Sequence, residues 1–521
     1  MPALGASIPA LIGRAAAWYG EREAVVDEKT RLTFRQVDRR SNRLAHALLA
    51  ASPEQGARVA LLMPNRAEFV EADFAIAKAG KVKLPINPRL AAAERLHLLR
   101  DSGADTLIFD LQFADFVSEA RRELEGVRSF VALGGRGAGA EEYEELLARA
   151  SDAAPGIHPP DDAASFLLYT SGTTGRPKGA TSTQRGRRAA TLTMLAEEIE
   201  ADPGDAMVHV GSVAHGSGSK ILAYFLRGAR NILVPKWDPQ AFLALVARER
   251  ATGSFMVPTM LGALLEAARH ESTDTSSLRA ISYGGAPIAP SRLEQIVERF
   301  GSVFVQVYGS CEAPHPLTVL TRAEHRPPPG QQARLASIGR ETAQTELRLV
   351  DDAGRDVPPG ETGEMWVRGA HVMSGYWNNP AATAEAFRDG WYRTGDVARR
   401  DEDGYCYIVD RVRDMIISGG LNVYPAEVEA CLQRHPAVLE AAVIGVPDDE
   451  WGESVKAIVV LRPGAAAGEA ALIEHCRAHL AGYKKPRSVD FVQELPKGST
   501  GKILKRDLRE PWWEGRKRRV Q

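Results

Sequence analysis

The chain has little cysteine and none of the spacings that hold zinc or build a disulfide framework. Its four cysteines, Cys311, Cys406, Cys431 and Cys476, are spread over a chain of 521 residues, and no two of them form a CxxC motif. The sequence therefore predicts neither a zinc site nor disulfide bonds. Cysteines that stay reduced fit a cytoplasmic location.

The sequence also lacks long apolar runs and a large net charge. No apolar run approaches the ~18 residues of a membrane-spanning helix, so we expect no integral membrane segment. Near the N-terminus, apolar residues recur at helical spacing over residues 8–19, which predicts an amphipathic helix rather than a signal peptide. A formal net charge of -2 gives nucleic acid no electrostatic attraction as the main partner.

What is present is an alternation of short apolar runs with longer helical patterns, up to about residue 330. Helical patterns such as 240–250 and 291–300 separate most of the runs, which predicts an α/β domain of parallel sheets flanked by helices. The predicted strands are 58–63, 106–109, 166–169, 207–210, 231–234, 254–257, 279–283 and 303–308.

The pattern changes twice toward the C-terminus. Residues 335–410 alternate as strands do, for example at 346–350 and 364–368, which predicts a small antiparallel barrel or sheet on the main body. Beyond about residue 413, the pattern predicts a small α+β domain. Its expected elements are helices at 425 onward and 469–480 and strands at 439–446, 454–461 and 488–492.

One loop after the predicted strand 166–169 has the chemistry of a polyphosphate site. Residues 169–179 read YTSGTTGRPKG, in which hydroxyls and glycine amides can donate to an anion and Lys178 adds a positive charge. Lys178 is followed by Gly179, where a P-loop needs Ser or Thr, so a Walker-type NTPase is disfavoured. The residues expected to contact phosphate are Thr170, Ser171, Gly172, Thr173, Thr174, Gly175 and Lys178.

This loop resembles the signature of the adenylate-forming enzymes, which include acyl-CoA synthetases, luciferases and peptide-synthetase adenylation domains. The resemblance implies that Mg-ATP activates a carboxylic acid as an acyl-adenylate. The resemblance also gives Thr170 a catalytic role and a contact to the metal. Further motifs of the same family occur in order along the chain, and the resemblance covers about residues 30–510.

Two of these motifs come at the ends of predicted strands, at residues 283–287 and 308–312. In YGGAP (283–287), the resemblance places Gly285, Ala286 and Pro287 beneath adenine. In YGSCE (308–312), it implies that Tyr308 stacks on adenine, Gly309, Ser310 and Cys311 contact the nucleotide, and Glu312 holds Mg²⁺. Cys311 replaces the usual Thr, and a thiol is the weaker hydrogen-bond donor.

The remaining nucleotide motifs lie nearer the C-terminus. By resemblance, Asp396 accepts the ribose hydroxyls, Arg411 contacts ribose or phosphate, and Arg413 is the hinge between domains 1–410 and 414–521, with 411–413 as linker. The small domain is expected to rotate between two half-reactions, so that Ser418, Gly419 and Gly420 line the thiol tunnel. Lys502 matches the catalytic lysine that stabilises the reacting oxygens.

The thiol acceptor is left open between coenzyme A and a carrier-protein pantetheine. By resemblance to bacterial acyl-CoA and aryl-CoA ligases, four residues could stack on the adenine of coenzyme A and pair with its 3′-phosphate: Trp451, Tyr483, Lys485 and Arg487. We expect coenzyme A because the sequence shows no carrier-protein or condensation domain after this region, which favours an ATP-dependent acyl-CoA ligase of the kind that serves fatty acid metabolism. A noncatalytic adenylate-binding module is an alternative of another class. A homodimer is also left open.

The acyl pocket is expected just beyond the strand ends. The resemblance assigns His215 to the gate of this pocket, with a catalytic role, and places Tyr283, Gly284, Pro314 and His315 along its wall. No residue caps the pocket for acetate. The sequence therefore favours a medium-chain, cyclic or aromatic acid.

Overall fold

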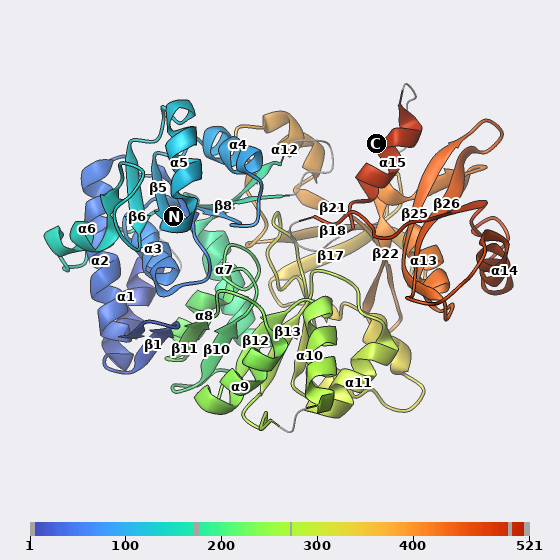
Figure 1. Cartoon of the computed structure of the whole chain (residues 1–521), viewed down its shortest axis with the longest axis horizontal. Coiled ribbons are helices and arrows are strands. Elements are labelled where there is room, and N and C mark those ends of the chain that lie inside the picture. The colour runs from blue at the N-terminus through green and yellow to red at the C-terminus, as the bar shows by residue number, and fades with distance from the viewer. Residues whose placement is uncertain (1–5, 171–176, 271–272, 499–502, 515–521) are drawn as a thin grey trace. The chain divides into compact units, whose positions relative to one another are not determined.

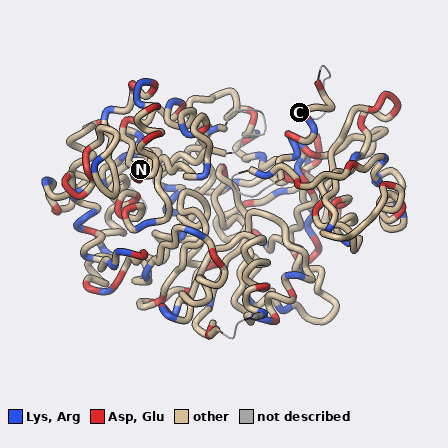
Figure 2. Tube along the Cα trace, viewed as in Figure 1, with Lys and Arg blue, Asp and Glu red and all other residues tan. Residues whose placement is uncertain are grey.

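The computed structural model describes residues 6–170, 177–270, 273–498 and 503–514, which form two compact units (Figure 1). The first unit contains Met1–Glu346 and Arg368–Glu385, and the second contains Leu347–Val367 and Ala386–Gln521. Acidic and basic residues are interspersed along the trace of each unit (Figure 2). Among the described helices, none has the length and apolar character that crossing a membrane requires.

The first unit contains two large sheets. In the nine-stranded sheet, the central strands, from β14 to β1 in spatial order, run parallel to one another. The strands at both edges run antiparallel to their neighbours. Its strands, in spatial order, are β16 (Arg340–Glu341), β15 (Thr318–Leu320), β14 (Phe304–Tyr308), β13 (Ala280–Tyr283), β12 (Gly253–Met256), β10 (Ala206–His209), β11 (Arg230–Leu233), β1 (Glu23–Val26) and β2 (Arg31–Thr33).

The eight-stranded sheet is parallel from β8 to β7 and antiparallel at its other edge. Its strands, in spatial order, are β19 (Gly375–Tyr376), β9 (Gly179–Thr183), β8 (Ala164–Tyr169), β4 (Val82–Ile86), β3 (Arg58–Leu62), β5 (Thr106–Asp110), β6 (Ser129–Leu133) and β7 (Glu141–Glu142). Together the two sheets confirm the predicted α/β class, and each predicted strand of the first 330 residues is found.

Helices cover both faces of each sheet, because both faces of these strands are apolar. One buried cluster joins α1, α2, α3 and α8 to both sheets, a second packs α4 and α5 on the eight-stranded sheet, and a third packs α9, α10 and α11 on the nine-stranded sheet. The layers therefore alternate helix, sheet, helix, sheet, helix. The helices are α1 (Ile8–Tyr19), α2 (Phe34–Ala51), α3 (Ala67–Lys78), α4 (Ala92–Ser102), α5 (Ala114–Ala120), α6 (Tyr143–Arg149), α7 (Gln184–Glu197), α8 (Lys220–Leu226), α9 (Pro239–Glu249), α10 (Pro258–His270), α11 (Pro290–Phe300) and α12 (Pro380–Ala386).

The second unit contains an antiparallel sheet and an α+β part, as predicted. The antiparallel sheet consists of β17 (Thr345–Val350), β18 (Thr362–Gly369), β21 (Trp391–Arg400), β20 (Phe387–Arg388) and β22 (Cys406–Arg411). The α+β part has strands β24 (Leu421–Val423), β23 (Ile416–Ser418), β26 (Gly452–Leu461), β25 (Val438–Asp448) and β27 (Ser488–Phe491) and helices α13 (Pro425–Gln433), α14 (Glu469–His479) and α15 (Lys505–Trp513). The antiparallel sheet thus shares a compact unit with the C-terminal residues, and a hinge at 411–413 stays a prediction.

A buried ion cluster joins α3, β4 and α7 in the first unit. The Asp73 carboxylate lies 2.8 Å from the Lys83 ammonium and 2.8 Å from the Arg187 guanidinium, and its side chain is 2% exposed. Burial alone would raise the pKa of Asp73, but the two cations outweigh burial and lower it. The charge of Lys83 is therefore compensated inside a central strand, which explains how β4 contains a lysine.

We predict that Asp73→Asn destabilises the protein by about 3 kcal/mol, because it leaves two buried cations without their carboxylate. Thermal and urea unfolding would measure the loss. The pKa of Asp73 is lowered in the folded state, so its contribution is present at neutral pH and is lost as the pH falls through the acidic range. Glu266, whose ion pair is exposed, gives the control, since solvent screens this pair and Glu266→Gln should cost much less stability than Asp73→Asn. Equal stability of the two variants would contradict the prediction.

Candidate active site

The predicted phosphate loop connects β8 to its antiparallel neighbour β9. Ser171, Gly172, Thr173, Thr174 and Gly175 lie outside the described residues. At the neck of the loop, the Thr170 amide donates to the Lys178 carbonyl at 3.0 Å, and β9 begins at the next residue. A P-loop leads from a strand into a helix, so this strand–loop–strand arrangement agrees with the exclusion of a Walker motif.

The turns after β13 and β14 need glycine because other backbone atoms lie against them. A Cβ on Gly284 would come within 2.2 Å of the Val307 carbonyl oxygen, and a Cβ on Gly309 within 2.5 Å of the His315 amide nitrogen. Gly285 has φ +81°, a conformation that favours glycine. Because β13 and β14 are parallel neighbours, both turns leave the same edge of the sheet, where ligands bind in such folds.

Glu312 lies in the turn after β14 and is joined to the phosphate loop through Tyr376. The Tyr376 hydroxyl donates to Glu312 Oε1 at 3.0 Å, and the Lys178 ammonium lies 5.3 Å from the centre of the Tyr376 ring. Tyr376 belongs to β19, which pairs with β9. The lysine predicted to contact phosphate and the carboxylate predicted to hold a metal are thus brought together by a residue that no sequence motif indicated.

The described side chains fit Mg²⁺ and a polyphosphate. Among the described side chains, Tyr376 is the one that donates to the Glu312 carboxylate, and it donates to Oε1. The other oxygen, Oε2, is therefore left for a hard cation. The Ser310 hydroxyl accepts from the Ala313 amide at 3.1 Å and fixes the turn that carries Glu312. Cys311 and Tyr308 lie half-buried in the same segment.

Two of the predicted pocket residues, His215 and His315, lie on segments that contact each other. The His315 ring stacks on Phe255 with 5.5 Å between ring centres, and its Nε2 lies 3.0 Å from the Ser219 hydroxyl, four residues after His215. Burial, followed by the charge of Lys220, lowers the pKa of His315 to about 3, and burial also lowers the pKa of His215. Both imidazoles are therefore neutral at physiological pH. Pro314 is buried beside His315.

Tyr283 has a different position from the one the sequence suggested. Its side chain is 1% exposed, packs in the core beneath α10 and α11, and hydrogen-bonds through its hydroxyl to His325 Nε2 at 2.9 Å. The side chain of the preceding residue, Ser282, faces the opposite side of the sheet and lies near Glu198. Both faces of β13 are buried, so the burial pattern of this strand could not tell which face Tyr283 takes. We leave its side chain out of the proposed pocket.

A buried ion pair lies beside the His315–Phe255 stack and was missed by the sequence analysis. Lys220, the first residue of α8, pairs with Glu198 at the end of α7, and the two side chains are 1% and 0% exposed. The Lys220 ammonium also lies 5.2 Å from the centre of the Phe255 ring. Burial lowers the pKa of Lys220, whereas the Lys220 charge overcomes burial to lower the pKa of Glu198.

In the second unit, the two residues predicted to contact ribose lie opposite each other on neighbouring strands. Asp396 on β21 is directly opposite Arg411 on β22, and Arg411 Nε lies 3.1 Å from Asp396 Oδ1. Residues 394–396, which the sequence would allow as a simple turn, are part of β21, and Gly395 has φ +71° beside the irregular pairing. Burial and the nearby Arg411 lower the pKa of Arg413 to about 10.

The structure also joins the predicted thiol loop to part of the predicted coenzyme A contacts. Gly419 and Gly420 form the two-residue turn between β23 and β24, both with positive φ, after Ser418. The Gly419 amide donates to the Trp451 carbonyl at 2.8 Å, and the Arg487 guanidinium lies 4.8 Å from the centre of the Trp451 ring.

Two further predicted contacts are not brought into this group. Tyr483 is exposed and Lys485 is half-buried on the segment before β27. Lys502 lies outside the described residues, although its neighbours Lys497 and Ile503 pair with each other as an isolated bridge.

Comparison with known proteins identifies the family. The model of the AMP-binding enzyme matches residues 12–377, and that of the AMP-binding enzyme C-terminal domain matches residues 427–502. The chain belongs to the AMP-binding enzyme family. This confirms the predicted resemblance, the ligase class, and ATP, Mg²⁺ and coenzyme A as the cofactors of the class.

Similar members of the AMP-binding enzyme family act on both aromatic and aliphatic acids. A feruloyl-CoA synthase from Amycolatopsis sp is 42% identical over 92% of this chain and 94% of its own length. A medium/long-chain-fatty-acid–CoA ligase, FadD8 of Mycobacterium tuberculosis, is 37% identical over 94% of this chain and 87% of its own. The solved anthranilate CoA ligase AuaEII in complex with anthranoyl-AMP is 28% identical, with a TM-score of 0.87 and 98% coverage of each chain.

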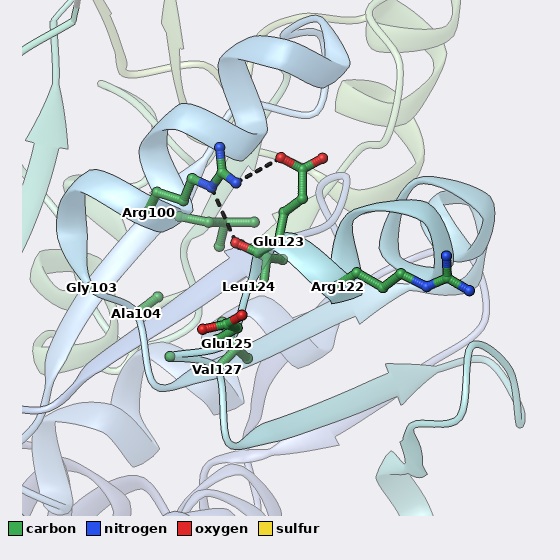
Figure 3. A pocket seen from close by; sticks show the side chains of 10 residues that line it. Arg100, Gly103, Ala104, Arg122, Glu123, Leu124, Glu125 and Val127 are labelled. Carbon is green, nitrogen blue, oxygen red and sulfur yellow. Dashed lines mark hydrogen bonds and ion pairs between the residues drawn. The ribbon is translucent and has the colours of Figure 1, made fainter.

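The first unit has a surface pocket near the end of α4 (Figure 3). It has a volume of about 410 Å³ and is lined by the end of α4 and by residues 122–127. Arg100 and Glu123 form an exposed ion pair at its rim, 2.6 Å apart. None of the residues that the family motifs indicate lines it, so we assign it no part in the reaction.

We predict that Tyr376→Phe lowers kcat/KM for Mg-ATP roughly tenfold, because Glu312 loses a hydrogen bond of the stronger, charge-assisted kind. Steady-state kinetics with varied Mg-ATP would measure the effect. Tyr407→Phe is the matched control, since it also removes a hydroxyl bonded to a carboxylate, that of Asp401 at 2.8 Å on the antiparallel sheet. Wild-type kinetics for Tyr376→Phe would contradict a role for this contact.

Proposed function

We propose that this enzyme joins an aromatic carboxylic acid to coenzyme A through an acyl-adenylate. The observation that supports the proposal is the contact of Tyr376 with both Lys178 and Glu312, the residues that we propose to bind phosphate and Mg²⁺. An adenylate is needed because a carboxylate has no adequate leaving group of its own.

In the first half-reaction, a carboxylate oxygen attacks the α-phosphorus of ATP, and the bond to the β-phosphate oxygen breaks to release pyrophosphate. Thr170 and Lys178 hold the departing phosphates. Glu312 and Thr170 would hold Mg²⁺, which would supply positive charge to the phosphates. Tyr308 stacks on adenine above Gly285, Ala286 and Pro287. Asp396 and Arg411 hold the ribose, and Lys502 stabilises the charge that develops on the reacting oxygens.

In the second half-reaction, the thiol attacks the acyl carbon and AMP leaves. We propose that residues 414–521 turn about Arg413 between the two steps, which withdraws Lys502 and brings the turn at Ser418, Gly419 and Gly420 to the thiol. His215 gates the acyl pocket and stays neutral there, because burial lowers its pKa.

Coenzyme A is favoured over a carrier-protein pantetheine by the contacts of Trp451. Arg487 lies over the exposed Trp451 ring and can pair with a phosphate while the ring stacks on adenine. A pantetheine arm carries neither adenine nor a 3′-phosphate, so it would leave both side chains without a ligand. Tyr483 and Lys485 would extend the same surface.

An aromatic acid with polar substituents is favoured over an alkyl acid by the buried pair beside the predicted pocket. His315 and Phe255 present flat rings, and Lys220 and Glu198 place charge directly behind them. An alkyl chain that reached this pair would have no hydrogen-bonding group to offer it. The similarity to a feruloyl-CoA synthase supports the same class of acid.

Two finer points of the proposal concern the whole molecule. We propose a cytoplasmic enzyme, since its cysteines form no disulfide in the described structure. A homodimer is the proposed assembly, and light scattering of the purified protein would test it.

The proposal predicts that hydroxylated aromatic acids such as ferulate give acyl-CoA with a kcat/KM roughly tenfold above that of octanoate. Chromatography of acyl-CoA, with AMP and pyrophosphate counted in parallel, would measure it. Replacing coenzyme A by dephospho-coenzyme A should raise KM for the thiol, because Arg487 loses its phosphate. ATP hydrolysis that ignores added acid, or a preference for octanoate, would contradict the proposal.

We further predict that the double change Glu198→Gln and Lys220→Met shifts the preference between ferulate and octanoate roughly tenfold toward octanoate. Changing both residues avoids a lone buried charge, which would itself destabilise the fold. The control is Asp161→Asn with Arg188→Met, another ion pair that involves α7, which should leave the ratio unchanged. A purely structural pair would instead lower the activity with both acids equally.

A further inference from the structure

Two helices of the second unit bring together a cysteine and two histidines that take no part in the proposed reaction. Cys431 lies on α13, and His475 and His479 lie one turn apart on α14, which packs against α13. One ligand atom from each of the three residues can be chosen so that all lie within 4.8 Å of one another. We propose that Cys431, His475 and His479 bind a Zn²⁺ ion.

The hydrogen bonds of the two histidines leave one nitrogen of each ring for a metal. His475 Nε2 lies 3.0 Å from the Cys431 carbonyl oxygen, and His479 Nδ1 lies 2.8 Å from the His475 carbonyl oxygen. A ring nitrogen that donates to a carbonyl carries the proton, so Nδ1 of His475 and Nε2 of His479 keep their lone pairs. Metal-binding histidines are oriented by this kind of outer contact.

The ligand set favours zinc over the harder cations. Thiolate and imidazole are ligands that Zn²⁺ prefers at about 2.0–2.3 Å, whereas Mg²⁺ and Ca²⁺ prefer oxygen. A fourth position remains for water or for His435, whose ring lies 5.2 Å from that of His475. Three protein ligands and one open position are a common zinc arrangement.

The burial of the three residues gives the ion a route from solvent to the thiol. Cys431 is buried, His475 is half-buried and His479 is exposed, so the cluster opens outward along α14. A bound ion would join α13 to α14 at a point where apolar packing gives way to solvent. Cysteine spacing could not reveal this cluster, because Cys431 is its one cysteine and His475, the nearer histidine in the chain, lies 44 positions further on.

Cobalt titration of the full-length protein tests the proposal. The protein is first dialysed against a chelator and then kept in excess Mg²⁺, which occupies the oxygen site at Glu312. Co²⁺ should bind with one equivalent and give a thiolate-to-cobalt charge-transfer band together with intense visible bands of a tetrahedral site. Zn²⁺ should displace it.

Two variants and one control complete the test. Cys431→Ser should abolish the charge-transfer band, and His479→Gln, a change at an exposed residue, should weaken Co²⁺ binding at least about tenfold. Cys406→Ser, at a buried cysteine on β22, should leave both unchanged. The proposal is overturned if wild-type protein shows no thiolate band, or if His479→Gln binds Co²⁺ as tightly as wild type.

Discussion

The contact on which the first unit's site depends is that of the Tyr376 side chain with Lys178 and Glu312. These three residues come from an edge strand, from the neck of the phosphate loop and from the turn after β14. The Tyr376 hydroxyl fixes one carboxylate oxygen, and its ring faces the ammonium. The charges that would hold metal and phosphate are therefore positioned relative to each other by an uncharged side chain, so they need not pair directly and cancel.

The layered architecture makes this contact achievable. Parallel strands end at one edge of each sheet, and glycines at 284 and 309 allow turns to pass within van der Waals distance of neighbouring backbone. One charged group inside the unit, Asp73, is compensated by Lys83 and Arg187. The Lys220–Glu198 pair is compensated in the same way but lies next to the predicted acyl pocket, which is why we give it a part in selecting the acid.

Much of the fold and of the motif positions could be predicted from the sequence, because strands and glycine turns are local patterns. What could not be predicted depends on partners distant in the chain. The strand β4 was not predicted because it contains Lys83 and Pro85. A lysine is acceptable in this central strand only because Asp73, a residue distant in the sequence pattern, compensates its charge. Tyr376 carries no motif, and the orientation of Tyr283 follows from packing on β13, both faces of which are buried.

The central claim is that the acid is activated as an adenylate before any thiol takes part. Exchange of radiolabelled pyrophosphate into ATP, measured without coenzyme A, tests this claim most directly, because exchange requires the first half-reaction to run forward and back. We expect exchange that depends on an added aromatic acid and is lost in Glu312→Gln. Exchange that needs coenzyme A, or that proceeds equally without acid, would contradict the account.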